Sequence, residues 1–110
     1  MNTQLQQNAL VELVPVGNSA VGEELVVDNL VVQAAALMGV ATHAVVSIKD
    51  AAVLVTFDGS APASSGAGVL YAVGEREVWH QNRLAAAKFI EAVGGSDAVV
   101  RVEPMCFDPQ

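Results

Sequence analysis

Histidine and serine are the residue types of this chain that first suggest metal binding or nucleophilic catalysis. Its two histidines, His43 and His80, have no second His or Cys at the spacing of a metal site. Ser60, Ser64 and Ser65 lie in a stretch rich in Gly, Ser and Pro that lacks the pattern of a nucleophile elbow. A hydrolase would need a pocket that joins His80 to one of these serines. The sequence therefore predicts neither a metal site nor a catalytic site at these positions.

Paired acidic residues could act in acid–base catalysis, and a glycine-rich run could bind a nucleotide. Glu23 with Glu24, and Glu75 with Glu77, lie beside turn glycines rather than in an enclosed pocket that would shift a pKa. We expect these carboxylates to be solvated. Gly66-Ala67-Gly68 lacks the rest of a dinucleotide-binding fingerprint, and no phosphate-binding Gly-Lys-Ser or Gly-Lys-Thr follows any glycine cluster.

Asp58 and Cys106 complete the set of candidate residues. Asp58-Gly59 resembles only the start of a calcium-binding loop, because no further acidic residue follows until Glu75. Cys106 is the single cysteine of the chain, which rules out an internal disulfide and is typical of a reducing compartment. We expect an unreactive buried or tail thiol there, no bound cofactor and no enzymatic activity.

Charge and terminal sequence limit the kinds of partner. Twelve Asp and Glu residues against five Lys and Arg residues give a net charge of −7, and no Lys or Arg precedes Lys49. Nucleic acid is therefore not an expected partner, because binding a phosphate backbone needs clustered positive charge. No uninterrupted apolar run is long enough for a transmembrane helix, and the polar start lacks the features of a secretory signal. We expect synthesis in the cytoplasm and no membrane partner.

Valine and alanine dominate the apolar residues and indicate the fold class. The chain has 110 residues, of which 20 are Val and 18 are Ala, whereas aromatic residues make up 5%. Thin and β-branched side chains suit a pleated sheet, and this length suits one hydrophobic core. The prediction is an all-β protein, an antiparallel β-sandwich or a small jelly-roll-like barrel. Its parts would be a flexible arm at 1–8, a single β domain at 9–104 and a C-terminal tail at 105–110.

Short β-rich runs between turn residues predict about eight strands. They fall at 9–16, 24–32, 42–48, 52–57, 69–73, 76–80, 88–93 and 98–103. The run 24–32 is either one bulged strand or two short ones. The Ala-rich segment 33–40 favours helix by propensity but is short for a stable one, so helix and strand both stay open.

Turn chemistry predicts how these runs connect. Lys49-Asp50-Ala51 and Gly94-Gly95-Ser96-Asp97 are each predicted to join two strands as a hairpin. The stretch 58–68 is predicted to be a surface loop, and 81–87 a turn or single helical turn with Leu84 pointing inward. Pro104 is expected to end regular structure. In 53–57 the odd-numbered residues are expected to face the core.

A series of short motifs occurs in a familiar order between residues 53 and 102. They are Val-Leu-Val-Thr-Phe-Asp-Gly-Ser-Ala-Pro at 53–62, Ser-Gly at 65–66, Ala-Ala-Lys-Phe-Ile at 86–90, Gly-Gly-Ser-Asp-Ala at 94–98 and Val-Arg-Val at 100–102. This order resembles small structural proteins of tailed bacteriophages that are encoded near the capsid genes. The resemblance implies a capsid decoration or cement protein, a β-sandwich on the virion surface that clamps the joints between major capsid protein subunits.

Two other functions are also compatible with the sequence. The same kind of module serves as a neck or tail-fibre adaptor. A carbohydrate-binding β-sandwich would use Trp79 and Tyr71 as its platform, which requires both rings to be exposed on one face. In either case a Val- and Ala-rich sheet must cover its strand edges, so we also expect a homodimer or homotrimer.

Overall fold

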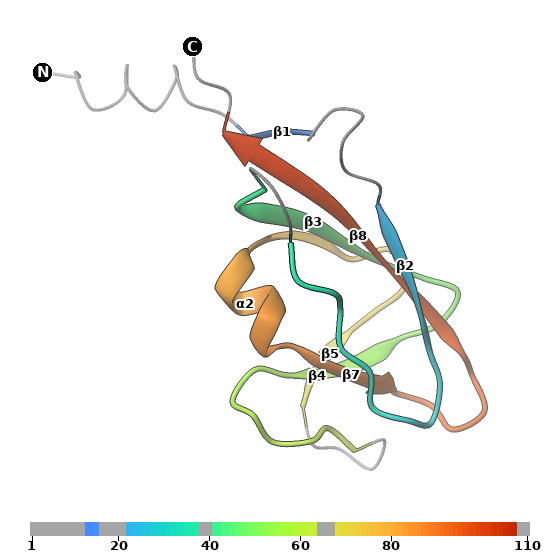
Figure 1. Ribbon diagram of the computed structural model, residues 1–110. Coiled ribbons are helices and arrows are strands. Elements are labelled where there is room, and N and C mark those ends of the chain that lie inside the picture. Colours follow the sequence, from blue (N-terminus) through green and yellow to red (C-terminus); the bar gives the residue numbers. More distant parts are fainter. Residues whose placement is uncertain (1–12, 16–21, 38–40, 64–67, 108–110) are drawn as a thin grey trace, which may run out of the picture.

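The structure, a computed structural model, describes residues 13–15, 22–37, 41–63 and 68–107 and forms two antiparallel sheets packed together (Figure 1). Its elements in chain order are β1 (Leu13–Pro15), β2 (Glu23–Val27), β3 (His43–Lys49), β4 (Val53–Thr56), β5 (Val69–Tyr71), β6 (Arg76–His80), α2 (Gln81–Ala86), β7 (Lys88–Glu91) and β8 (Ala98–Phe107). The predicted all-β, sandwich-like fold is confirmed.

The longest strand, β8, organises the larger sheet. It pairs with β3 on one side and with β1 and β2 on the other, and β6 pairs with the far side of β3. The smaller sheet has the order β5-β4-β7, and Val32 forms an isolated bridge to Phe89 of β7. All of these pairings are antiparallel.

Both predicted hairpins are wrong. The strands β3 and β4 belong to different sheets, and so do β7 and β8. Each connecting turn reverses the chain, but it carries the chain across the sandwich instead of along one sheet. The physical reason is that turn residues determine a local change of direction, whereas the partner of a strand depends on which apolar faces meet in the core.

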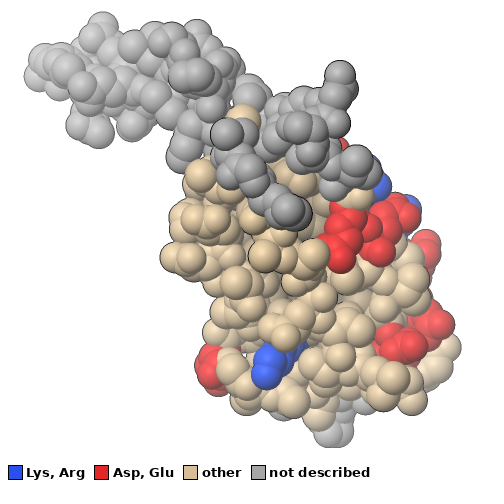
Figure 2. All heavy atoms as spheres, viewed as in Figure 1, with Lys and Arg blue, Asp and Glu red and all other residues tan. Residues whose placement is uncertain are grey.

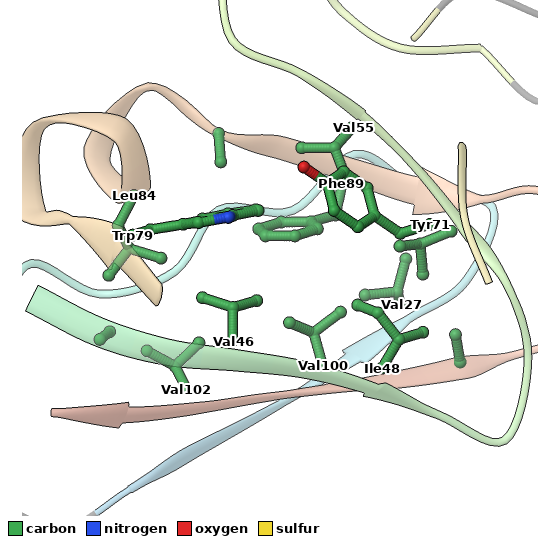
Figure 3. Close-up of a cluster of buried hydrophobic side chains, with 14 residues drawn as sticks. Val27, Val46, Ile48, Val55, Tyr71, Trp79, Leu84, Phe89, Val100 and Val102 are labelled. Carbon is green, nitrogen blue, oxygen red and sulfur yellow. The ribbon is translucent and has the colours of Figure 1, made fainter. Parts of the chain in front are cut away.

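The core lies between the two sheets and is built from alternate residues of their strands (Figure 3). Val53 and Val55 of β4 face this core as predicted, and Phe57 packs against it. Leu54 and Thr56 are buried as well, so β4 is covered on both faces. The aromatic rings of the core lie among Val27, Val46, Ile48, Val55, Val100 and Val102.

The C-terminal boundary also differs from the prediction. Strand β8 continues through Pro104 to Phe107, which takes in the first residues of the predicted tail. On one side of β8, β2 pairs with 98–102 and β1 with 105–107, so Pro104 falls in the gap between them. A proline is tolerated there because its missing N–H is not needed for a ladder on that side.

The remaining predicted segments fall partly within the described residues. In the segment 24–32 the strand ends at Val27, a bend follows, and Val32 forms an isolated bridge. The segment 33–37, for which helix and strand were both open, forms neither. The short helix α2 confirms the predicted helical turn, and Leu84 is buried on it. The predicted arm at 1–8, the start of the first strand, 38–40 and 64–67 lie outside the described residues.

Candidate functional site: the open edge of the sandwich

One edge of the sandwich is closed by the chain that follows β2. The carbonyl of Asp28 accepts a hydrogen bond from the Glu91 N–H at 2.9 Å, and Val32 and Phe89 exchange two backbone bonds of 3.0 and 2.9 Å. At the opposite edge, β5 and β6 follow each other in the chain but belong to different sheets. We call β5, β6 and the turn 72–75 between them the open edge.

The turn of the open edge has a defined shape. Gly74 has a φ of +91°, in the left-handed region that favours glycine. The Glu75 N–H donates to the Ala72 carbonyl at 3.1 Å, and the Ala72 N–H donates to Oε1 of Glu75 at 2.8 Å. Ile48 at the end of β3 accepts from the Gly74 N–H at 2.8 Å and donates to the Glu75 carbonyl at 3.0 Å. These bonds fix β5 and β6 relative to each other.

Glu77 connects the two strands of the open edge through its side chain. Its Oε1 accepts hydrogen bonds from the Trp79 indole N–H at 2.8 Å and from the Tyr71 hydroxyl at 2.9 Å. Residues two apart in a strand share a face, which is why Glu77 reaches the ring of Trp79. The carboxylate thus provides an acceptor for the polar atoms of two buried aromatic residues, which would otherwise be costly to bury.

The same contacts shift the ionisation of these groups. Hydrogen bonds from Trp79 and then Tyr71 lower the pKa of Glu77; burial opposes them, and the positive charge of Arg83 adds to the lowering. Burial raises the pKa of Tyr71, and the hydrogen bond to Glu77 acts in the same direction. Glu77 is therefore ionised and Tyr71 protonated at neutral pH, as their hydrogen bond requires.

Arg83 covers this cluster from helix α2. Its Nη2 donates to the Tyr71 hydroxyl at 3.2 Å and lies 4.0 Å from Oε1 of Glu77. Its guanidinium carbon is 4.2 Å from the ring centroid of Phe57 and 5.4 Å from that of Trp79, in the range of cation–π contacts. The guanidinium thus contacts one carboxylate and two aromatic rings, so it stabilises the packing of α2 on this cluster rather than forming an anion-binding site.

The aromatic rings do not form a carbohydrate platform. Trp79 and Tyr71 are only 1% and 6% exposed. The Trp79 ring stacks on Phe89 at a centroid distance of 6.0 Å (Figure 3). The rings of Phe57 and Tyr71 make T-shaped contacts with Trp79 at centroid distances of 5.2 and 5.8 Å. A carbohydrate platform needs exposed rings, so Trp79 and Tyr71 cannot provide one.

The two histidines lie opposite each other across β3 and β6. Their ring centroids are 5.1 Å apart, and the rings meet edge to face. Nδ1 of His80 accepts a hydrogen bond from the Asn82 N–H at 3.1 Å and caps helix α2. Nδ1 of His43 and Oγ1 of Thr42 are 2.9 Å apart. Within the described residues, no group of three or more His, Cys, Asp or Glu side chains is placed to hold a metal ion.

Ser60 is bound locally and is not paired with His80. Its hydroxyl and its N–H both donate to Oδ1 of Asp58, and its carbonyl accepts from Oγ1 of Thr56. The hydrogen bonds from Ser60 lower the pKa of Asp58. Ser64 and Ser65 lie outside the described residues. Asp58 and Ser60 thus form a turn, and the structure does not bring Ser60 to His80 for catalysis.

The other acidic candidates bind basic side chains or a backbone N–H group. Glu24 pairs with Lys49 at 2.9 Å and with Arg101 at 3.3 Å, and these partners lower its pKa. Glu23 accepts a hydrogen bond from the N–H of Ala35 at 3.0 Å. These carboxylates therefore stabilise strands and turns and do not form acid–base pairs.

Cys106 belongs to the strand β8 and not to a tail. It lies opposite Val14 of β1 and is a half-buried free thiol. The sequence alone did not indicate this position, because Pro104 suggested that regular structure ends before it.

Apolar side chains are exposed at the open edge. Val69, Leu70 and Val73 are 52%, 59% and 56% exposed. Single exposed apolar residues are ordinary. Val69 and Leu70 are consecutive in β5 and point to opposite faces of the strand, so with Val73 they surround its free edge, and we call these three side chains the apolar patch of the open edge. Beside this patch is a hollow of about 480 Å³, lined by Val55, Thr56, Phe57, Asp58, Ser60, Gly68 and Val69.

Charges are distributed unevenly over the surface. Figure 2 shows acidic residues gathered along the side formed by β2 and β8, whereas much of the remaining visible face carries no charge. The basic residues on that side are neutralised, because Lys49 and Arg101 both pair with Glu24 and Arg101 also lies 3.5 Å from Glu103. The surface therefore offers a partner apolar and acidic contacts.

None of the helices in the described part of the chain is long and apolar enough to cross a membrane. Comparison with models of protein families, with curated proteins and with solved structures finds no match to this chain.

Proposed function

We propose that this chain is a virion structural protein of a tailed bacteriophage, a decoration or cement protein that stabilises contacts between major capsid protein subunits. The ordered motifs between residues 53 and 102, which resemble small phage structural proteins, suggest this role. The protein would be made in the cytoplasm of the bacterial host and act on the capsid surface. It would need no cofactor and would act as a homo-oligomer.

The patch of Val69, Leu70 and Val73 is the observation that carries the proposal. These side chains are more than half exposed and lie on an edge strand with no strand beyond it in the described residues. Burying apolar area on a partner gains about 25 cal/mol per Å² before the costs of association are subtracted. Such a modest contact per copy suits a protein that binds a shell at many equivalent places.

Binding by many copies has a direct effect on shell stability. A protein that binds only the assembled shell stabilises it by mass action, even when each copy binds weakly. The proposed role is therefore one of adhesion, in which the rigid sandwich presents the open edge and the shell supplies the complementary surface.

The test is a binding and stability experiment on heads of the phage that encodes this chain. Heads with the wild-type protein are expected to survive heating that opens heads lacking it. The double variant Leu70→Ser, Val73→Ser is expected to bind at least about tenfold more weakly, because it removes the apolar contact. Leu30→Ser is the matched control, because Leu30 is 67% exposed but follows β2 at the closed edge.

Two outcomes would contradict the proposal. Heads that are equally robust with and without the protein would exclude a cement role. Labelling that finds the protein only at the neck or tail would instead support the adaptor function, the second candidate for a module of this kind.

A further inference from the structure

Among the residues that the structure describes, the strand β6 forms the outer edge of the larger sheet and pairs only with β3, on one side. The flanking bonds are from the Gln81 N–H to the Thr42 carbonyl at 2.8 Å and from the Ile48 N–H to the Glu75 carbonyl at 3.0 Å. In an antiparallel pair, every second residue exchanges hydrogen bonds with its partner strand. Glu77 and Trp79 therefore bond to β3, and the backbone of Val78 faces away from it.

The backbone groups that face away are arranged symmetrically about Val78. Arg76 and His80 lie two residues on either side, so their N–H groups also point outward. His80 is the N-cap residue of α2, so its carbonyl accepts the first hydrogen bond within that helix. A row of outward-facing backbone groups therefore remains: the N–H and carbonyl of Arg76, those of Val78, and the N–H of His80. One further strand could form hydrogen bonds with all of them.

We propose that β6 pairs antiparallel with β6 of a second copy about a two-fold axis at Val78, which joins the two larger sheets into one. The Val78 backbone groups of the two copies would bond each other reciprocally. At each end, the N–H of His80 would donate to the Arg76 carbonyl of the second copy. An isologous contact of this kind closes on itself and produces a dimer.

The side chains of β6 suit this partner. Val78 is 53% exposed and lies directly opposite Val45 of β3. Pairing two copies would set the Val78 side chains against each other and extend an apolar row from Val45 of one copy to Val45 of the other.

Charge also favours a second copy at this edge. The chain as a whole carries −7, which opposes self-association, but β6 carries one positive residue, Arg76, and one negative residue, Glu77. In the proposed register Arg76 faces His80 and Glu77 faces Trp79, so no acidic residue meets another. The strand also lacks proline, which commonly protects open edges from pairing.

The proposal differs from the capsid contact, because it concerns β6 and the backbone rather than the apolar patch of β5. The test is sedimentation of the whole chain over a range of concentrations. We expect a monomer–dimer equilibrium for the wild type and at least about tenfold weaker association for Val78→Lys, because like charges would then lie opposite each other. Val93→Lys is the control, because Val93 is 59% exposed but lies outside β6.

A crosslinking experiment tests the register itself. In a Cys106→Ser background, Val78→Cys is expected to form a covalent dimer on mild oxidation, because facing residues of such a pair have Cα atoms about 5.5 Å apart, within the range for a disulfide. Val93→Cys should remain monomeric. Circular dichroism melting of each variant verifies that it is folded.

Three results would overturn the proposal: a strictly monomeric wild type, a trimer, or a dimer that Val78→Lys leaves unchanged and Val78→Cys does not crosslink. Its failure is separable from that of the capsid function. A monomer that still binds heads would refute the dimer and the expected homo-oligomer but leave the capsid role standing, and a dimer that does not bind heads would refute only the capsid role.

Discussion

Oε1 of Glu77 lies 2.8 Å from the indole nitrogen of Trp79, although the first side chain is about half exposed and the second is completely buried. The two residues share a face of the edge strand β6, and Glu77 sits where the gap between the sheets meets solvent. One carboxylate therefore completes the hydrogen bonding of the buried aromatic cluster while remaining in contact with water. This relationship leads to the first prediction.

Replacing Glu77 should destabilise the protein in a pH-dependent way. The pKa of Glu77 is lowered in the folded state, so its charge contributes stability above the unfolded pKa of about 4.3, and this contribution is lost as pH falls through the folded pKa. Glu77→Gln keeps an acceptor but removes the charge. The loss in free energy of unfolding relative to wild type should be largest at neutral pH and should shrink below about pH 4. Urea unfolding of both proteins at several pH values measures this difference.

A second variant separates charge from hydrogen bonding. Glu77→Leu leaves the Trp79 N–H and Tyr71 hydroxyl without their acceptor and should cost about 1–3 kcal/mol at neutral pH. Asp97→Asn, an exposed position in the turn before β8, is the control. An equal pH dependence in Asp97→Asn and Glu77→Gln would show that the effect is one of net charge only.

The connection between β7 and β8 depends on a single glycine. Gly95 has a φ of +83°, which other residues adopt at a cost, and a Cβ there would meet no atom within 4 Å. Gly95→Ala should therefore lower the free energy of unfolding by about 1 kcal/mol through backbone strain alone. Gly94→Ala also meets open space but has no such φ, and thermal melting should find it close to wild type. Equal effects of the two substitutions would contradict this account.

The two faces of β8 should respond differently to truncation. Val100 is fully buried between the sheets, whereas its neighbour Val99 is half-buried on the outer face. We expect Val100→Ala to cost about 2 kcal/mol, because it removes buried methyl groups and leaves a cavity, and Val99→Ala to cost clearly less. Chemical denaturation of both variants provides the comparison. Similar losses would mean that the outer face of β8 is covered as well.

His80 should stabilise the short helix α2 as its N-cap. Its Nδ1 accepts the Asn82 N–H, which has no partner within the helix. His80→Ala should cost about 1 kcal/mol, and His80→Asn should recover most of it, because asparagine is also a good N-cap. Hydrogen exchange at Asn82 reports the cap directly. Unchanged exchange in His80→Ala would show that the cap contributes nothing.

Most local features of this protein follow from the amino-acid sequence alone. The strands at 43–49, 53–56, 69–71, 76–80 and 88–91 lie where β-rich runs predicted them, and Leu84 is buried on a single helical turn. These features follow from β-branched side chains, alternation and turn residues, which act over a few positions.

The pairing of the strands and the contacts between distant side chains depend on the tertiary structure. The turns after Lys49 and Glu91 were predicted as hairpins, yet each one carries the chain to the other sheet. Likewise, no spacing in the sequence places His43 opposite His80. Pairing partners are set by the joint burial of residues far apart in the chain, and the open edge exists because β5 and β6 were distributed to different sheets by that burial.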